Sequence, residues 1–178
     1  MLTHRQQVSH TLEPKASFSL RDRLLTHLSL PSPSIIAGYI PIRGEINPIP
    51  TLEAFLAMGH TACLPVVTAP QTPLLFRSWA PGEPLERGTF HTQVPLPSVQ
   101  ECKPDVLLVP LATFDRTGQR LGYGGGFYDR TLEALRSTKS ILAIGIAYSF
   151  QEIATVPTEP TDQPLDWICT NTDLIRFV

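Results

Sequence analysis

Residues 106–114 read VLLVPLATF, and this stretch decides the fold class of the chain. The run is continuous and apolar, which is typical of a strand that is covered on both faces. Four glycines follow it within five positions, and residues 127–135 then place Tyr128, Leu132 and Leu135 along one stripe of a helix. A buried strand, a glycine-rich loop and a helix in this order indicate an α/β domain.

Short strands and helices alternate on both sides of this stretch. Helices are expected at residues 15–29, ending before Pro31, and at residues 52–58, and strands are expected at residues 34–42, 61–67, 74–79, 141–148 and Trp167–Thr170. The alternation predicts a three-layer α/β domain with a mostly parallel central sheet flanked by helices, and we expect residues 1–178 to form a single domain. In such a sheet the binding crevice lies beyond the carboxyl ends of the strands, so the loop after residue 114 is the first candidate site.

The composition argues against several classes of protein. The net charge is −2, and no basic excess suggests binding to nucleic acid. No apolar run approaches the ~20 residues that cross a bilayer, and the N-terminus lacks the apolar stretch of a signal peptide. Cys63, Cys102 and Cys169 are far apart, which argues against a disulfide framework and a zinc site and favours reduced thiols. We therefore expect a cytoplasmic monomer that binds small molecules.

The loop after the central strand carries the chemistry. Residues 114–130 read FDRTGQRLGYGGGFYDR. Glycines let the backbone approach a ligand, and the N-terminus of the following helix offers N–H groups and a partial positive charge, so the loop suits a phosphate. Arg116, Arg120 and Arg130 supply guanidinium groups that match phosphate oxygens. Asp129, in the first helical turn, is placed to hold Mg²⁺ beside a triphosphate.

No standard nucleotide motif matches this loop. A P-loop needs a lysine after the glycines, and here Phe127 stands at the last glycine position of the dinucleotide pattern. A tight strand-to-helix connection, in which Asp129 only caps the helix dipole, therefore remains an alternative.

The run FDRTGQRLGYGGGFYDR closely resembles the signature of the 5-formyltetrahydrofolate cyclo-ligase family. Three further stretches resemble family segments in the same order along the chain. They are residues 39–46 (YIPIRGEI), residues 64–67 (LPVV) followed by 75–79 (LFRSW), and residues 156–166. The resemblance covers roughly residues 11–170.

This resemblance implies an ATP-dependent reaction. Members of the family close the ring of 5-formyltetrahydrofolate to give 5,10-methenyltetrahydrofolate, ADP and phosphate. The formyl oxygen attacks the γ-phosphate, N10 captures the resulting iminium phosphate, and phosphate leaves. Such a reaction asks the protein for positioning and charge neutralisation rather than for a nucleophile. The sequence agrees, because it shows no Ser/His/Asp or Cys/His constellation.

Carried onto matching positions, the resemblance implies a set of site residues. Those that bind ATP are Arg120, Leu121, Gly122, Tyr123, Gly124, Gly125, Gly126, Phe127 and Tyr128, with Arg120 and Tyr128 as catalytic residues. Those that bind the folate are Ile40, Glu45, Tyr123, Gly124, Gly125, Gly126 and Phe127. Asp129 and Asp162 bind Mg²⁺. From the residues alone, Ile40 is instead a core position, Glu45 a solvated carboxylate and Asp162 a turn former.

The sequence departs from the family at its N-terminus. Members begin with a basic helix of the form K-x-x-L-R that helps to hold ATP, and this motif is missing here, with His4-Arg5 at the place of its later part. The departure motivates an alternative function, a non-catalytic relative that binds folate or nucleotide. A further alternative is a sugar-phosphate isomerase-like enzyme, which would need a base that the sequence does not indicate.

Overall fold

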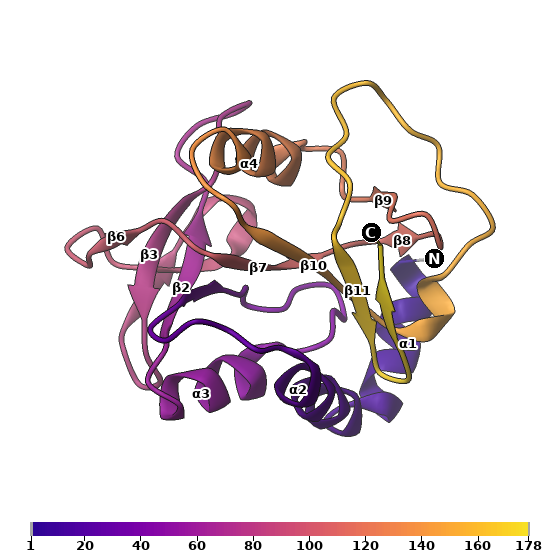
Figure 1. The fold of residues 1–178 in the computed structure, drawn as a ribbon, viewed down its shortest axis with the longest axis horizontal. Helices are drawn as coiled ribbons and strands as arrows, with labels where there is room; N and C mark the ends of the chain where they lie inside the picture. The colour runs from indigo at the N-terminus through magenta and orange to yellow at the C-terminus, as the bar shows by residue number, and fades with distance from the viewer. Residues whose placement is uncertain (1, 178) are drawn as a thin grey trace.

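The computed structural model describes residues 2–177 (Figure 1). At its centre lies an eight-stranded sheet whose strands are, in spatial order, β12 (Leu174–Arg176), β11 (Trp167–Thr170), β10 (Leu142–Ala147), β7 (Val106–Pro110), β1 (Ile35–Ala37), β2 (Thr61–Val66), β3 (Leu75–Trp79) and β6 (Glu101–Cys102). The five neighbouring strands from β11 to β2 are parallel to one another. Antiparallel strands are added only at the two edges, so the sheet is mostly parallel, as predicted.

Helices cover both faces of this sheet. The α-helices of the described chain are α1 (Leu2–Leu12), α2 (Lys15–His27), α3 (Ile49–Ala57) and α4 (Phe127–Arg136). Two small hairpins pair β4 (Leu85–Arg87) with β5 (Gln93–Pro95) and β8 (Thr113–Phe114) with β9 (Arg120–Leu121), and the short 3-10 helices are η1 (Thr89–His91) and η2 (Ser149–Gln151). Figure 1 shows α4 on one face and α2 and α3 on the other, which confirms the predicted layered α/β fold.

The apolar run of β7 explains why both faces are covered. Successive side chains of a strand point to opposite faces of the sheet. Val106 and Leu108 accordingly pack into a core cluster with residues of α2 and α3, including Leu20, Leu24, Leu52 and Phe55. Leu107 and Val109 pack into a second cluster with Leu132 of α4. We call these the lower and the upper cluster.

The order in which strands are added to the sheet reverses between β1 and β7. From β1 it continues through α3, on the lower face, to β2 on one side, and from β7 it continues through α4, on the upper face, to β10 on the other side. The loops that leave the carboxyl ends of β1 and β7 therefore diverge to opposite faces and open a crevice between them, which is where ligands bind in open α/β sheets.

Two predicted strands are shorter than expected. The prediction for residues 34–42 is wrong beyond Ala37, where β1 ends. The chain passes so close to α3 at Gly38 that a Cβ there would lie 2.5 Å from Leu52 Cδ1, and Pro41 has no N–H to donate to a ladder. The prediction for residues 106–114 is wrong beyond Pro110, because Thr113–Phe114 leaves the sheet to form the β8–β9 hairpin.

The other predicted elements are present with small shifts at their ends. The helices at residues 15–29, 52–58 and 127–135 correspond to α2, α3 and α4, and the strand at Trp167–Thr170 is β11 itself. Between residues 2 and 177, no helix combines the length and the apolar character that crossing a bilayer requires.

Candidate active site

The loops after β1 and β7 meet through their side chains at the carboxyl edge of the sheet. Tyr123, in the glycine-rich loop that follows β9, donates a hydrogen bond from its hydroxyl to Glu45 Oε1 at 2.6 Å. Glu45 belongs to the loop between β1 and α3 and lies 78 positions earlier in the chain. Two candidate residues from separate sequence motifs are thus in direct contact at the predicted crevice.

A tight turn holds the Glu45 carboxylate in this place. Arg43 and Gly44 both have positive φ angles, of 51° and 74°, and the Ile42 N–H donates to Glu45 Oε2 at 2.9 Å. Glu45 is only 7% exposed. Burial raises the pKa of the Glu45 carboxyl, and the hydrogen bonds from Ile42 and Tyr123 only partly oppose this shift. Glu45 is therefore a buried acceptor and not the solvated turn carboxylate that its sequence context suggested.

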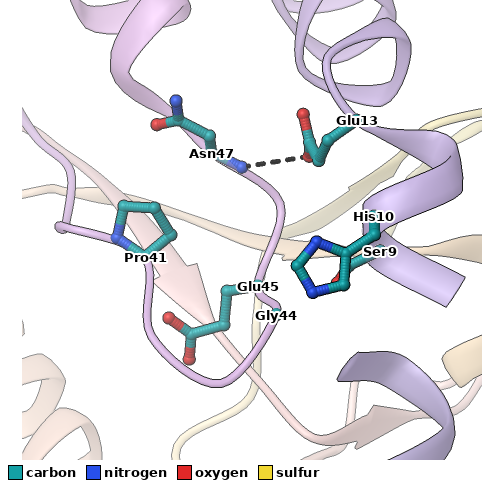
Figure 2. A pocket seen from close by; sticks show the side chains of 7 residues that line it. All are labelled: Ser9, His10, Glu13, Pro41, Gly44, Glu45 and Asn47. Atoms are coloured by element: carbon teal, nitrogen blue, oxygen red, sulfur yellow. Dashed lines mark hydrogen bonds between the residues drawn. The ribbon is translucent and has the colours of Figure 1, made fainter. Parts of the chain in front are cut away.

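A cavity of about 260 Å³ opens beside Glu45 (Figure 2). Its lining residues come from α1, from the turn that follows α1 and from the loop after β1, and they are Ser9, His10, Glu13, Pro41, Gly44, Glu45 and Asn47. Glu13 joins the two walls, because its Oε1 accepts hydrogen bonds from the Asn47 N–H at 3.3 Å and from the Tyr148 hydroxyl at 3.1 Å. The N-terminal helix is thus one wall of the site.

Arg5 of α1 is a site residue whose position the sequence did not reveal. Its side chain is buried, with Nε and Nη2 donating to the Arg43 carbonyl at 3.0 and 2.9 Å and Nη1 donating to the Leu111 carbonyl at 3.1 Å. Its guanidinium also lies 5.5 Å from the centre of the Tyr123 ring, and that of Arg43 lies 5.4 Å away. A lone arginine in a polar helix gives no burial signal in a sequence. The side chain of His4, its neighbour in the predicted motif, lies outside the described part.

The β8–β9 hairpin forms the base of the glycine-rich loop. Asp115 is buried in the turn of this hairpin. Its carboxylate accepts hydrogen bonds from the backbone N–H and the hydroxyl of Thr117 and from the backbone N–H groups of Gln119 and Val156. Burial alone would raise the pKa of the Asp115 carboxyl, but these hydrogen bonds outweigh burial and hold the pKa below its usual value. Asp115 therefore fixes the start of the loop, another role that sequence reasoning missed.

The glycine-rich loop leaves open space in front of its backbone. A Cβ added at Gly122 or Gly124 would meet no atom within 4 Å. Gly124 and Gly126 have φ angles of +84° and +60°, which favour glycine, and Gly126 is the residue that immediately precedes α4. Leu121 is exposed at the entrance to this loop. The open space lies in front of Gly122 and Gly124, whereas a Cβ at Gly125 or Gly126 would meet the side chain of Phe127 or Arg130. An anion that enters this space comes close to the N-terminus of α4, where backbone N–H groups are available.

The first turn of α4 is packed on both sides. The Phe127 ring contacts Phe90 edge to face at 6.0 Å between centroids and lies under the Arg130 guanidinium, which also donates to the Gly125 carbonyl. Tyr128 packs against the upper cluster. Burial and then the charge of Glu45 raise the pKa of the Tyr128 hydroxyl, which keeps this group protonated. Ile40 is half-buried and packs against the lower cluster.

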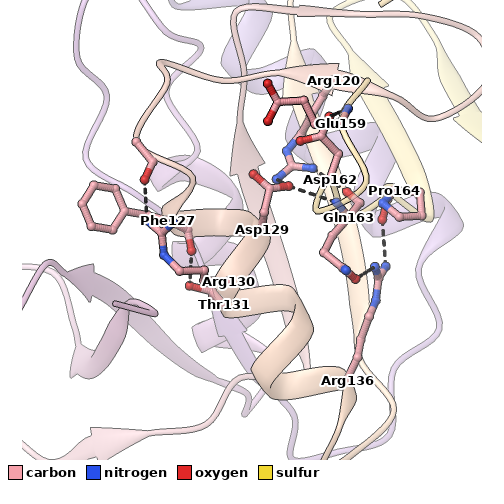
Figure 3. A network of polar contacts seen from close by, with 11 residues as sticks. Arg120, Phe127, Asp129, Arg130, Thr131, Arg136, Glu159, Asp162, Gln163 and Pro164 are labelled. Atoms are coloured by element: carbon pink, nitrogen blue, oxygen red, sulfur yellow. Dashed lines mark hydrogen bonds and ion pairs between the residues drawn. The ribbon is translucent and has the colours of Figure 1, made fainter. Parts of the chain in front are cut away.

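A network of charged and polar groups surrounds Asp129 (Figure 3). The Arg120 side chain, only 5% exposed, donates from Nη2 to Asp129 Oδ1 at 2.8 Å and from Nη1 to the Gln163 carbonyl at 2.6 Å. The Gln163 N–H donates to the same Asp129 oxygen at 3.0 Å. Asp162 accepts from the Glu159 N–H at 2.7 Å, and Figure 3 shows both residues near Asp129 at the start of α4.

The oxygen atoms near Asp129 suit a hard cation that keeps water or phosphate oxygens as its other ligands. No group of three or more histidine, cysteine, aspartate or glutamate side chains is arranged to hold a metal within residues 2–177. Asp129 and Asp162 provide carboxylate oxygens from two neighbouring segments. Mg²⁺ prefers oxygen ligands and is usually held by one or two carboxylates together with phosphate oxygens and water, so these residues fit it.

Comparison with known proteins places the chain in one group. Residues 1–171 match the model of the 5-formyltetrahydrofolate cyclo-ligase family. A 5-formyltetrahydrofolate cyclo-ligase of Haemophilus influenzae is 38% identical over 136 residues, which cover 73% of this chain and 72% of that protein. The Escherichia coli cyclo-ligase is 33% identical over 153 residues, covering 83% of this chain and 84% of the relative.

Solved structures agree with these sequence relatives. The NMR structure of Aquifex aeolicus 5,10-methenyltetrahydrofolate synthetase has a TM-score of 0.74 and 28% identity, and the match covers 99% of this chain and 93% of the other. The synthetase from Mycoplasma pneumoniae also has a TM-score of 0.74, with 27% identity over 96% of this chain and 93% of its own.

Proposed function

The chain belongs to the 5-formyltetrahydrofolate cyclo-ligase family, and we propose that it catalyses the ATP- and Mg²⁺-dependent cyclisation of 5-formyltetrahydrofolate to 5,10-methenyltetrahydrofolate with release of ADP and phosphate. The family resemblance inferred from the glycine-rich signature is confirmed, and with it the assignment of the chain to an enzyme class, the ligases.

The contact between Tyr123 and Glu45 carries this proposal. It joins a loop built to accept phosphate with a buried carboxylate beside a cavity. Transfer of a phosphoryl group to a formyl oxygen requires both reactants within reach of each other, because catalysis here depends mainly on positioning and electrostatics. A crevice with a phosphate wall and a folate wall meets this requirement.

The glycine-rich loop forms the phosphate wall. Gly122 and Gly124 of residues 120–128 face open space, and the backbone N–H groups of this loop and of the N-terminus of α4 would bind the phosphates of ATP. Asp129 and Asp162 would hold Mg²⁺, which supplies neutralisation of phosphate charge when bound. Arg120 supports this wall from behind, since its buried guanidinium holds Asp129 and Gln163 together. Tyr128, protonated and next to the loop, would donate a hydrogen bond to charge that develops during transfer.

The loop after β1 forms the folate wall. The buried Glu45 carboxylate would accept hydrogen bonds from the donor groups of the pterin ring, which a carboxylate can do with both oxygens. Ile40 would offer an apolar surface to the ring, and residues 123–127 would close the site from the side of α4. The Tyr123 hydroxyl now occupies Glu45 Oε1, so the folate would displace it or share this oxygen.

The N-terminal helix supports the catalytic function over a non-catalytic one. The alternative rested on the missing basic motif, yet α1 lies against the site and buries Arg5 between the two loops. A cationic group at this place stabilises the loop backbone through its carbonyls and adds positive charge near the phosphate wall.

We also propose the cellular setting that the sequence indicated. The enzyme acts in the cytoplasm as a monomer on its two small-molecule substrates, without nucleic acid or membrane partners. The net charge of −2 and the dispersed cysteines support this setting.

Coupled turnover tests the proposed function. We expect the protein to form methenyltetrahydrofolate only when ATP, Mg²⁺ and 5-formyltetrahydrofolate are all present. The absorbance of methenyltetrahydrofolate measures its formation, and one ADP should be released for each molecule of product. ATP hydrolysis that is independent of the folate, or binding of the folate without product at saturating ATP, would contradict the proposal.

A further inference from the structure

The segment between η2 and β11 carries Asp162 without a helix or strand to position it. Residues 154–166 form a long loop that rises beside the carboxyl ends of β7 and β10 and passes the start of α4 (Figure 1). Each end is tied to the β8–β9 hairpin, because the Val156 N–H donates to Asp115 Oδ2 at 2.8 Å and the Leu165 N–H donates to the Gly118 carbonyl at 3.1 Å. Between these anchors, the Asp162 N–H donates to the Glu159 carbonyl at 3.0 Å, which closes a local turn, and side-chain contacts attach this turn to the rest of the fold.

Arg136 makes several of these contacts from the last turn of α4. Its Nη1 donates to Gln163 Oε1 at 3.2 Å and its Nη2 donates to the Pro164 carbonyl at 2.9 Å (Figure 3). The same Nη2 lies 3.3 Å from Asp166 Oδ2. Asp166 is itself tied to β10, since the same Oδ2 accepts from the Ala143 N–H at 2.7 Å. Arg136 therefore clamps residues 163–166 against both the helix and the sheet.

Arg136 and Asp129 act on the same short segment from one side of α4. They are seven positions apart, which is about two helical turns, so they project from one face of the helix. Asp129 Oδ1 accepts from the Gln163 N–H while Arg136 holds the Gln163 side chain. Gln163 is thereby held at its backbone and at its amide, and the preceding residue, Asp162, is carried to the start of α4.

We propose that Arg136 is a positioning residue for the magnesium site, which it assembles by fixing Gln163 so that Asp162 lies beside Asp129. The inference rests on the proposed function, because the roles of Asp129 and Asp162 as ligands are part of it. Residues that orient metal ligands without touching the metal commonly contribute about 10–100-fold to metal affinity. An arginine suits the task, since its planar fork reaches three acceptors at once and a lysine cannot.

Binding of Mn²⁺ in the presence of ADP, measured by electron paramagnetic resonance, tests the proposal without relying on turnover. We expect Arg136→Gln to weaken Mn²⁺ binding about 10–100-fold. ADP binding in the absence of metal and binding of 5-formyltetrahydrofolate should stay at the wild-type level. Arg136→Lys should restore part of the Mn²⁺ affinity, because an ammonium can still donate to one or two of the acceptors. In turnover, the magnesium concentration for half-maximal rate should rise while kcat at saturating magnesium is retained.

Lys139→Gln is the matched control. It removes the same charge near the same end of α4, but its ammonium is paired with Asp105 and the Lys103 carbonyl, away from residues 159–166. We expect wild-type Mn²⁺ binding for this variant. Should Arg136→Gln fail to fold, Gln163→Leu removes the amide acceptor and leaves the backbone contacts to Arg120 and Asp129 in place, so a weaker loss of Mn²⁺ affinity is expected there.

The outcomes separate this proposal from the one on which it rests. Suppose that the wild type binds Mn²⁺ in the presence of ADP. If Arg136→Gln and Gln163→Leu then bind Mn²⁺ as tightly as the wild type, the role of Arg136 is overturned and the metal site is not. A wild-type protein whose ADP binding is indifferent to Mn²⁺ would overturn the metal site itself and the positioning role with it.

Discussion

Glu45 combines a cost in stability with a proposed role in folate binding. Its carboxyl is buried and its pKa is raised, so the folded protein holds this proton more tightly than the unfolded chain does. The charged form is therefore destabilising, and this contribution grows as the pH rises from the titration range of the unfolded chain through the folded-state pKa. A buried ionised group that lowers stability is common at functional sites.

Glu45→Gln separates these two effects. At neutral pH we expect the variant to unfold at higher denaturant concentration than the wild type, and this difference should vanish in acid, where the wild-type carboxyl is also protonated. Folate affinity should fall about 10–100-fold, because a hydrogen bond to a charged group contributes about 1.5–3 kcal/mol. Denaturation at several pH values and folate titration are the measurements. ATP affinity serves as the control, and an equal loss of both affinities would reject the role in folate binding.

Asp129 and Asp162 differ in what else depends on them. An exposed carboxylate in a first helical turn contributes only about 0.3–1 kcal/mol, but Asp129 is paired with the nearly buried guanidinium of Arg120. Removing its charge leaves Arg120 without a charged partner, so Asp129→Asn should lower stability by about 1.5–3 kcal/mol in addition to its effect on metal binding. Loss of stability in this variant therefore does not argue against a metal role.

Asp162→Asn provides the cleaner test of the metal pair. Among the described residues its carboxylate forms no ion pair, and its contact is with the Glu159 N–H, which an asparagine oxygen can also accept. We expect a raised magnesium requirement in the turnover assay with an unfolding free energy close to that of the wild type. A variant with wild-type magnesium dependence would remove Asp162 from the site.

The glycine-rich loop combines open space with backbone conformations that favour glycine. Gly122 and Gly124 both face open space, but only Gly124 has a positive φ angle. We expect Gly124→Ala to cost about 1–2 kcal/mol in stability, because a side chain is strained in this conformation, whereas Gly122→Ala should be nearly neutral. Both alanines should weaken ATP binding, since each Cβ intrudes on the space in front of the loop. Thermal denaturation and nucleotide titration distinguish the two effects, and unchanged ATP affinity in both variants would place the phosphates elsewhere.

Elements were predictable where one local pattern dominated. The apolar run of β7 and the stripe of α4 predicted the sheet and its upper layer, and the glycine-rich loop indicated where the candidate site lies. α1 was not predicted as a helix that packs on the site, because its sequence LTHRQQVSHTL is polar and its key contact is the burial of Arg5 by distant carbonyls. The end of β1 was also missed because it depends on a contact between residues far apart in the sequence. The chain leaves the strand at Gly38, where it passes close to Leu52 of α3. The contact of Tyr123 with Glu45 depends on topology alone.

At the scale of the whole molecule, the two core clusters share one sheet. Each strand near the centre contributes alternate side chains to both clusters, so neither layer can separate without exposing the other. We therefore propose that residues 1–178 are one domain, and we expect a single calorimetric transition whose van't Hoff and calorimetric enthalpies agree. Folate at about 100 times the wild-type Kd should raise Tm by about 5–10 °C, and at the same folate concentration Glu45→Gln should show a shift of only about 1–5 °C. Two separate transitions would contradict the single-domain proposal.

The crevice between the loops after β1 and β7 depends on single residues, on the two loops and on the reversal of strand order in the sheet. A crystal structure with a non-hydrolysable ATP analogue, Mg²⁺ and 5-formyltetrahydrofolate tests it most directly. We expect the terminal phosphate in front of residues 122–126, the metal on Asp129 and Asp162, and the pterin ring on Glu45, with the formyl oxygen facing the phosphate. A nucleotide bound away from this loop, or a folate that leaves Glu45 paired only with Tyr123, would contradict the account.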